Sequence, residues 1–131
     1  MPLEVQLVSP EQVLYVGEAR MVVARTLEGG DVAFLPGHAP FLGALAVRPV
    51  RVIEADDITR AFAVHGGFVE VAHDRVIILS DVAELAGDID VARARAAIER
   101  AEAALRDEPD DAGAQAALER ATVRIEVAGV V

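Results

Sequence analysis

The sequence predicts an N-terminal antiparallel β-sandwich followed by a C-terminal antiparallel two-helix hairpin, because the spacing of its apolar residues changes once along the chain. Up to about residue 86, apolar and polar residues alternate in short stretches, which is the period of a half-buried strand. Beyond that point apolar residues recur every three or four positions, which is the period of an amphipathic helix. We therefore expect a mainly β domain over residues 1–86 and a helical hairpin over residues 87–131.

The strand pattern occurs in nine short segments that are separated by turn residues. These segments are residues 3–7, 13–16, 19–26, 32–35, 41–46, 50–54, 58–64, 68–72 and 75–79. The separating residues include Gly29-Gly30 and Gly66-Gly67, and glycine favours turns because it adopts positive φ freely. Short strands at this spacing are typical of a sandwich or a flattened barrel.

The helical part begins near Gly87 and Asp88, which we expect to act as hinge and N-cap, with Asp90 in the first turn. Residues 108–111, Glu-Pro-Asp-Asp, are expected to end the first helix and cap the second, and so short a loop makes the helices antiparallel. The apolar stripes are Val91, Ala94, Ile98, Ala101 and Leu105 in the first helix, and Leu118, Ala121, Ile125 and Ala128 in the second. Because alanine buries little area, we expect the hairpin to be marginally stable and able to move.

The composition excludes several classes of function. The chain has 22 acidic and 12 basic residues, and its net charge of −10 repels nucleic acids and anionic lipids. It has no cysteine, which excludes disulfides and thiolate metal sites. Neither a signal peptide nor a membrane-spanning helix is predicted, so we expect contact with a membrane only through a partner.

No catalytic residue and no metal site are predicted. His38, His65 and His73 lie on predicted turns and lack the spacing of metal ligands. The chain also lacks a nucleophile elbow and a glycine-rich phosphate loop. A small hydrolase built on the sandwich is therefore the least favoured function.

Two pairs of arginines on the predicted helices are candidates for binding an anion. Arg93 and Arg100 are seven residues apart, and Arg120 and Arg124 are four apart, so each pair shares one helix face. In a closed hairpin their guanidinium groups could converge on a polyphosphate. The alternative is a solvated face, because acidic residues lie nearby, namely Glu99, Glu102 and Glu119. The spacing alone favours that alternative.

Five segments, in their order along the chain, resemble the epsilon subunit of bacterial F-type ATP synthases. They are Val8-Ser9-Pro10-Glu11, Leu35-Pro36-Gly37-His38-Ala39-Pro40, Gly66-Gly67-Phe68-Val69-Glu70-Val71, Ile77-Ile78-Leu79-Ser80-Asp81-Val82-Ala83-Glu84 and Ile89-Asp90-Val91-Ala92-Arg93-Ala94. The resemblance covers residues 3 to 128 and implies a sandwich of about ten strands followed by a two-helix hairpin.

The resemblance implies a non-catalytic rotor subunit in the central stalk of a proton-translocating ATP synthase, at the cytoplasmic face of the bacterial cell membrane. The sandwich would bind the gamma subunit and rest on the c-ring. Asp31 and His38 would contact the c-ring loops. The sequence around His38, taken alone, marks this residue as an ordinary exposed turn residue. An extended hairpin would reach the alpha/beta catalytic ring and inhibit ATP hydrolysis.

The resemblance also implies that the closed hairpin binds ATP as a regulatory ligand, and it leaves the role of magnesium open. The matching positions are Glu84, Ile89, Asp90, Arg93, Ala94, Arg100, Arg120 and Arg124. The loop between the helices is shorter than usual and the chain end carries no basic residues, which makes strong inhibition doubtful. Two alternatives stay open: a structural coupler whose hairpin binds no nucleotide, and a free-standing nucleotide-sensing module.

Overall fold

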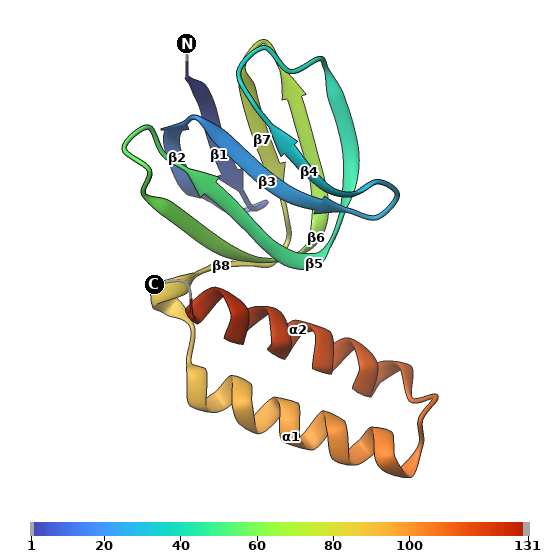
Figure 1. Ribbon diagram of the computed structural model, residues 1–131. Coiled ribbons are helices and arrows are strands. Elements are labelled where there is room, and N and C mark those ends of the chain that lie inside the picture. Colours follow the sequence, from blue (N-terminus) through green and yellow to red (C-terminus); the bar gives the residue numbers. More distant parts are fainter. Residues whose placement is uncertain (1, 130–131) are drawn as a thin grey trace.

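The computed structural model describes residues 2–129 and shows a β-sandwich with a pair of helices packed below it (Figure 1). The strands are β1 (Leu3–Val8), β2 (Val13–Ala19), β3 (Met21–Thr26), β4 (Gly30–Phe34), β5 (Phe41–Ile53), β6 (Thr59–Ala72), β7 (Arg75–Leu79) and β8 (Ala83–Leu85). A 3-10 turn, η1 (Ala86–Asp88), leads to the helices α1 (Val91–Asp107) and α2 (Ala112–Ala128). The predicted fold class is confirmed. Met1 of the predicted sandwich range, and Val130 and Val131 of the predicted hairpin range, lie outside the described residues.

The strands form a continuous sheet that folds over on itself around the core (Figure 1). Neighbouring strands follow the order β2-β1-β7-β6-β5-β3-β4, and β8 pairs with β6 off this path. The pairing is antiparallel except between β1 and β7, which run parallel. The first half of β6 pairs with β8 and its second half with β7. β6 thereby connects the lower edge of the sandwich, next to the helices, to its central strands.

Two of the predicted breaks between strands are wrong, because the chain continues through them as a strand. Gly66 and Gly67 have φ values of 85° and 115°, yet they lie within β6 and bend that strand without reversing it. Pro49 lies within β5. Four predicted segments therefore form only two strands, β5 and β6. With the short β8, which the pattern did not predict, the sheet has eight strands among residues 2–129 rather than nine or ten.

The main core lies entirely within the sandwich. Alternate residues of β1, namely Leu3, Val5 and Leu7, are buried, as the two-residue period predicts. Phe34 and Phe62 are the largest fully buried side chains. Among residues 2–129, no helix residue belongs to this main cluster of buried residues, so the sandwich has a core that does not depend on the hairpin.

The two helices are antiparallel and are capped by aspartates. Asp90, rather than the predicted Asp88, is the N-cap of α1, and its side chain accepts a hydrogen bond of 3.0 Å from the backbone of Arg93. Asp88 lies within η1, and the extended residue Ile89 separates that turn from the helix. Asp111 caps α2 through a 3.0 Å bond from the backbone of Ala114.

The second helix buries two faces, of which the sequence predicted one. Ala101 and Ala121 of the predicted stripes are buried, which agrees with packing between the helices. Val123 and Val127 lie on another face of α2 and pack against Ala61 and Ala63 of the sandwich. We call this small apolar cluster, together with its half-buried neighbours Val47, Ala86 and Ile89, the docking cluster.

Candidate functional site

Side chains from three elements meet where α2 lies against the sandwich. Glu84 on β8 accepts a hydrogen bond from Arg124 on α2, whose Nε lies 2.7 Å from Oε1 of the carboxylate. The same oxygen lies 2.8 Å from Nε2 of His65 on β6. A carboxylate oxygen only accepts, so Nε2 of the neutral imidazole is the donor. We call these three residues the junction cluster.

The register of the sheet explains why His65 and Glu84 meet. Ala63 on β6 is paired with Glu84 on β8. Side chains two residues apart on a strand lie on the same face, so His65 follows Ala63 on the face that α2 covers. Arg124 directly follows Val123 of the docking cluster. The polar junction cluster is therefore adjacent to the apolar docking cluster, and both attach the same helix.

Burial and neighbouring charges shift the pKa values in the junction cluster. Burial lowers the pKa of His65 from its ordinary 6.5, while the hydrogen bond with Glu84 opposes this change and the charge of Arg124 adds to it. Partial burial raises the pKa of Glu84, but the hydrogen bonds from Arg124 and His65 outweigh that effect, and the net pKa lies below 4.5. At neutral pH Glu84 is therefore ionised and His65 is neutral.

His65 has a buried atom without a hydrogen-bond partner. Its side chain is only 4% exposed, and Nδ1 is buried with no partner among the described residues. With the hydrogen on Nε2, this atom carries a lone pair. A second proton would have to reside on Nδ1, where no acceptor faces it.

The structure brings together only some of the predicted nucleotide-binding residues. Glu84 contacts Arg124, and the charge of Arg120, one turn earlier on α2, helps to lower the pKa of His65. Arg93 and Arg100 are exposed on α1, and within residues 2–129 neither forms a salt bridge. The junction cluster thus includes arginine from α2 and none from α1.

The remaining predicted nucleotide-binding residues have structural roles at the start of α1. Ile89 packs against the docking cluster, and Asp90 caps the helix. Ala94 is buried one turn later. These residues fix where α1 begins relative to the sandwich, whatever else they bind.

The two predicted c-ring contacts do not share one turn. Asp31 lies near the start of β4, is exposed, and faces Arg25 at 3.7 Å. His38 follows the other end of β4, and its ring packs edge-on against Phe34 with centroids 5.0 Å apart. The strand β4 therefore lies between the two predicted contact residues.

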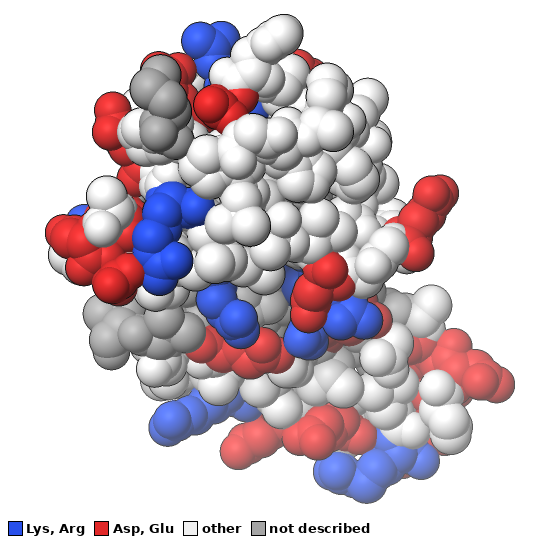
Figure 2. Space-filling model, turned by 45° about the horizontal axis from the view of Figure 1, so that its top comes forward, with Lys and Arg blue, Asp and Glu red and all other residues white. Residues whose placement is uncertain are grey.

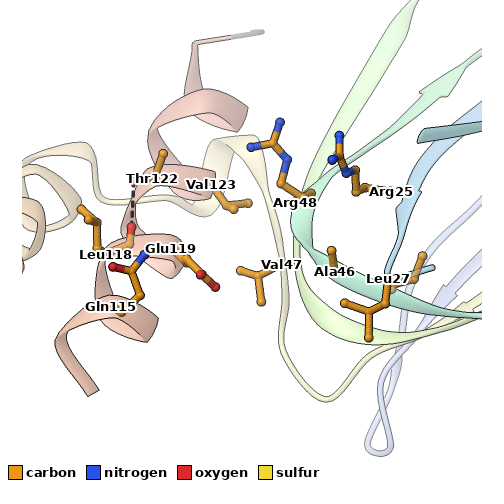
Figure 3. A pocket seen from close by; sticks show the side chains of 11 residues that line it. Arg25, Leu27, Ala46, Val47, Arg48, Gln115, Leu118, Glu119, Thr122 and Val123 are labelled. Carbon is orange, nitrogen blue, oxygen red and sulfur yellow. Dashed lines mark hydrogen bonds between the residues drawn. The ribbon is translucent and has the colours of Figure 1, made fainter. Parts of the chain in front are cut away.

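An open groove with a volume of about 800 Å³ lies between α2 and the strands β3 and β5 (Figure 3). Leu118 lines its helix side, and Val47 lines its strand side together with Arg25 and Arg48. Arg48 lies 3.6 Å from Glu126 of α2. The first half of α2 thus stands apart from the sandwich, and the docking contacts are in its second half.

The surface of the sandwich has a broad face without charge. Figure 2 shows this face above a region of mixed charges that extends over the helices. Several large apolar side chains of the sandwich are exposed, such as Leu42 at 71% and Phe68 at 54%. Phe68 is paired in the sheet with Leu79, which is also exposed. Adjacent exposed apolar residues are typical of a protein–protein contact.

Neither a metal site nor a membrane span is found in the described part of the chain. No group of three or more His, Asp or Glu residues among residues 2–129 is arranged to hold a metal ion. No helix in that range has the length and the apolar character needed to cross a membrane.

Sequence reasoning missed His65, which it assigned to a turn. The residue belongs to β6 and directly follows the buried residues Ala61 to Val64. That uninterrupted apolar run was the available signal, because a strand buried on both faces loses the alternating pattern. The same loss of alternation occurs in α2, where Val123 and Val127 stand beside the predicted stripe.

Comparison with known families covers nearly the whole described chain. The family model for the beta-sandwich domain of the ATP synthase delta/epsilon chain matches residues 2–86, and the model for the long alpha-helix domain of the same chain matches residues 88–129. The protein belongs to the ATP synthase delta/epsilon chain family. Its junction cluster includes residues from both matched regions.

Relatives in this family share close to half of the aligned residues. The ATP synthase epsilon chain of Brevibacillus brevis is 46% identical over 86 residues, which are 66% of this chain and 64% of that protein. The alignment thus spans a little under two thirds of that relative. The epsilon chain of Streptomyces avermitilis is 43% identical over 86 residues, 66% of this chain and 68% of that protein. The epsilon chain of Frankia casuarinae is 45% identical over 85 residues, which are 65% of this chain but 99% of that protein.

Two solved structures share the fold. A chain of the mitochondrial ATP synthase of Euglena gracilis superposes with a TM-score of 0.82 at 24% identity, over 97% of this chain and 81% of that chain. A chain in the central stalk and c-ring structure of Tetrahymena thermophila gives a TM-score of 0.53 at 16% identity, over 98% of this chain and 95% of that chain. The arrangement of sandwich and helices therefore occurs in both structures.

Proposed function

We propose that this protein is the non-catalytic rotor subunit of a bacterial F-type ATP synthase and joins the gamma subunit to the c-ring in the central stalk. The observation that carries this proposal is the match of both family domains, in order, over residues 2–129. The exposed apolar residues of the sandwich support it, since a rotor subunit is held by protein contacts. The subunit would take part in coupling proton flow to ATP synthesis at the cytoplasmic face of the cell membrane.

Co-purification tests this proposal. The tagged chain is expressed with the gamma subunit and the c-ring of the same organism, and the isolated complexes are analysed by mass spectrometry. We expect a complex with both partners that survives deletion of residues 88–131, because the sandwich core does not use the hairpin. A chain that elutes alone under these conditions would instead favour the free-standing nucleotide-sensing module.

We further propose that the closed hairpin binds ATP and that its extended form contacts the alpha/beta ring and inhibits hydrolysis. The motif residues Ile89 to Ala94 support this, as do the contact of Arg124 with Glu84 and the nearness of Arg120 to His65. ATP at 100 times its dissociation constant would stabilise the closed form by about 2.7 kcal/mol, which is large for a hairpin with an alanine seam.

Calorimetry with ATP tests the nucleotide site. We expect Arg93→Ala to weaken binding by about tenfold or more, because a charge-assisted bond to phosphate is lost. Arg95→Ala is the matched control, since Arg95 is an exposed arginine of the same helix outside the predicted set. Absence of heat with the unaltered chain would remove the proposal of ATP binding. Inhibition is tested by deleting residues 88–131 in the intact complex, where we expect ATP hydrolysis to rise.

The structural coupler without nucleotide binding is the second candidate, and a specific observation favours it. Glu84 already neutralises Arg124, so the closed arrangement has an internal counterion for an arginine that the nucleotide would otherwise balance. The Frankia relative, which is barely longer than its 85 aligned residues, is only about as long as the sandwich. Calorimetry without heat and an intact rotor complex would together support this candidate.

A further inference from the structure

The second helix is held on the sandwich by few groups. The docking cluster consists of alanine and valine side chains with Ile89, and a buried methylene contributes only about 0.8 kcal/mol. The first helix packs mainly on the second, so it follows α2 when that helix moves. Against so small an apolar contact, the hydrogen bonds of the junction cluster are a large share of what keeps the hairpin in place.

Within the junction cluster, the charges of Glu84 and Arg124 balance each other only while His65 is neutral. Glu84 from β8 contacts Arg124 of α2 and the imidazole of His65, and the charge of Arg120, one turn earlier on α2, acts on His65. Arg48 of β5 and Glu126 of α2 form another ion pair across this interface, and their charges cancel each other. A protonated His65 would therefore be a second cation on the single carboxylate of Glu84, and its added proton would lie on the buried Nδ1, which has no hydrogen-bond partner among residues 2–129.

We propose that His65, Glu84 and Arg124 form a proton-operated latch, which holds the second helix on the sandwich at neutral pH and releases it when His65 takes up a proton. The latch rests on the movable hairpin proposed above but not on nucleotide binding. Release exposes His65 to water, which solvates both the imidazolium and its Nδ1–H. It also separates the imidazolium from Arg120 and Arg124.

The direction of the pH effect follows from the cited shift. The pKa of His65 in the docked state lies below 6.5, and in the released state it returns to that ordinary value. The contribution of His65 to docking is therefore complete above pH 6.5 and is lost as the pH falls through the docked-state pKa. The ratio of docked to released chains falls by up to about tenfold for each pH unit that separates the two pKa values. Glu84 acts in the same direction only at lower pH, because its own pKa lies below 4.5.

Distance measurement in the full chain tests the latch. The chain has no cysteine, so Glu28→Cys and Gln115→Cys take two dyes at defined places. Gln115 and Leu27, the neighbour of Glu28, line the groove, with Gln115 on the helix side (Figure 3). We expect the distance between the dyes to increase as the pH falls from 7.5 to 5, without nucleotide or other subunits. Fluorescence of Tyr15, the single tyrosine, reports whether the sandwich stays folded.

Substitutions separate the latch from other acid effects. In His65→Gln the side-chain amide donates to Glu84 but takes up no proton, so we expect a distance that stays short across this range. His73→Asn, at an exposed turn, is the matched control and should behave like the unaltered chain. In Arg124→Gln we expect a long distance already at pH 7.5. The pKa of His65, followed by NMR in that variant, should then rise towards 6.5.

Three results would overturn the latch: a distance that does not change with pH, an equal change in His65→Gln, or a loss of Tyr15 signal at the same pH as the distance change. Should His65→Gln not fold, the NMR titration decides, and an unaltered pKa of His65 in Arg124→Gln overturns the proposal. These results do not bear on ATP binding, which calorimetry measures independently. Conversely, an absence of ATP binding leaves the latch unaffected.

Discussion

At the scale of single residues, Tyr15 has an unusual proton affinity. Its hydroxyl donates to Oε2 of Glu54 at 2.6 Å, and its ring packs against Phe62 with centroids 5.1 Å apart. Burial, together with the hydrogen bond and the charge of Glu54, raises the pKa of Tyr15 to about 12, against a small opposing effect of Arg60. Because the folded-state pKa is raised, this contact stabilises the fold below pH 10 and ceases to do so as the pH rises through about 12.

We predict that the phenolate absorbance of Tyr15 is absent at pH 11 in the folded chain and present in the urea-unfolded chain. The single tyrosine makes this signal unambiguous. In Glu54→Gln the midpoint should move towards 10.0, while Glu18→Gln, an exposed substitution on β2, should leave it unchanged. A midpoint near 10.0 in the unaltered folded chain would contradict the contact with Glu54.

Gly67 is a position where a side chain is excluded by two independent effects. Its φ is 115°, and a Cβ atom there would collide with the backbone carbonyl of Leu79. Gly37 has a φ of 85° but open space around it, so it isolates the conformational effect. We expect Gly37→Ala to lower the free energy of unfolding by about 1–2 kcal/mol. Gly67→Ala should cost about 1–3 kcal/mol more, because β7 has to shift.

Urea unfolding of both variants measures this difference. An equal loss in the free energy of unfolding for Gly37→Ala and Gly67→Ala would show that β6 and β7 separate easily at this bend. The comparison also explains why the glycine pair was misread. The pair Gly66-Gly67 was predicted to be a turn between strands, but its positive φ values allow a close approach of two strands rather than a reversal of the chain.

At the scale of elements, the caps of the helices are local and separable. Asp111 accepts a hydrogen bond from the backbone of Ala114, whereas its neighbour Asp110 caps nothing. We expect Asp111→Ala to destabilise the hairpin by about 1 kcal/mol and Asp110→Ala to have little effect. Amide hydrogen exchange measures this for α2 directly. Equal exchange in the two variants would mean that docking, rather than capping, determines the stability of the helix.

Elements with one buried face were predictable, and those with two were not. The alternation in β1 and the stripe containing Ala94 and Ala101 match the buried positions, because each element packs on one side only, β1 on the sandwich core and α1 on α2. In β6, residues 61 to 64 are buried on both faces, since the helices cover the outer side. The periodicity of apolar residues does not predict burial of this outer face, because that burial depends on where α2 docks. For the same reason the spacing of the arginines could place each pair on one helix face, while the pairing of Arg124 with His65 and Glu84 was not predictable.

At the scale of the whole molecule, the structure consists of a self-sufficient sandwich and a dependent hairpin. The main core includes residues of the sandwich only, and its large side chains, such as Phe34 and Phe62, are remote in sequence from the helices. The hairpin adds the docking cluster and the junction cluster. Because the two parts share so little buried surface, we expect the hairpin to separate and unfold before the sandwich on heating.

The last prediction concerns a chain cut after residue 86. We expect it to fold with the Tyr15 signal of the full chain, since its core is complete, while Ala61 and Ala63 become exposed. The loss of Val123 and Val127 should lower the melting temperature by only a few degrees, because about 1 kcal/mol corresponds to 4–8 °C in a domain of this size. A matched full-length variant, Val123→Ala with Val127→Ala, should release the hairpin and melt like the cut chain. Calorimetric scans of the three proteins test this, and a cut chain that is unfolded at 25 °C would show that the hairpin is part of the fold rather than a mobile addition to it.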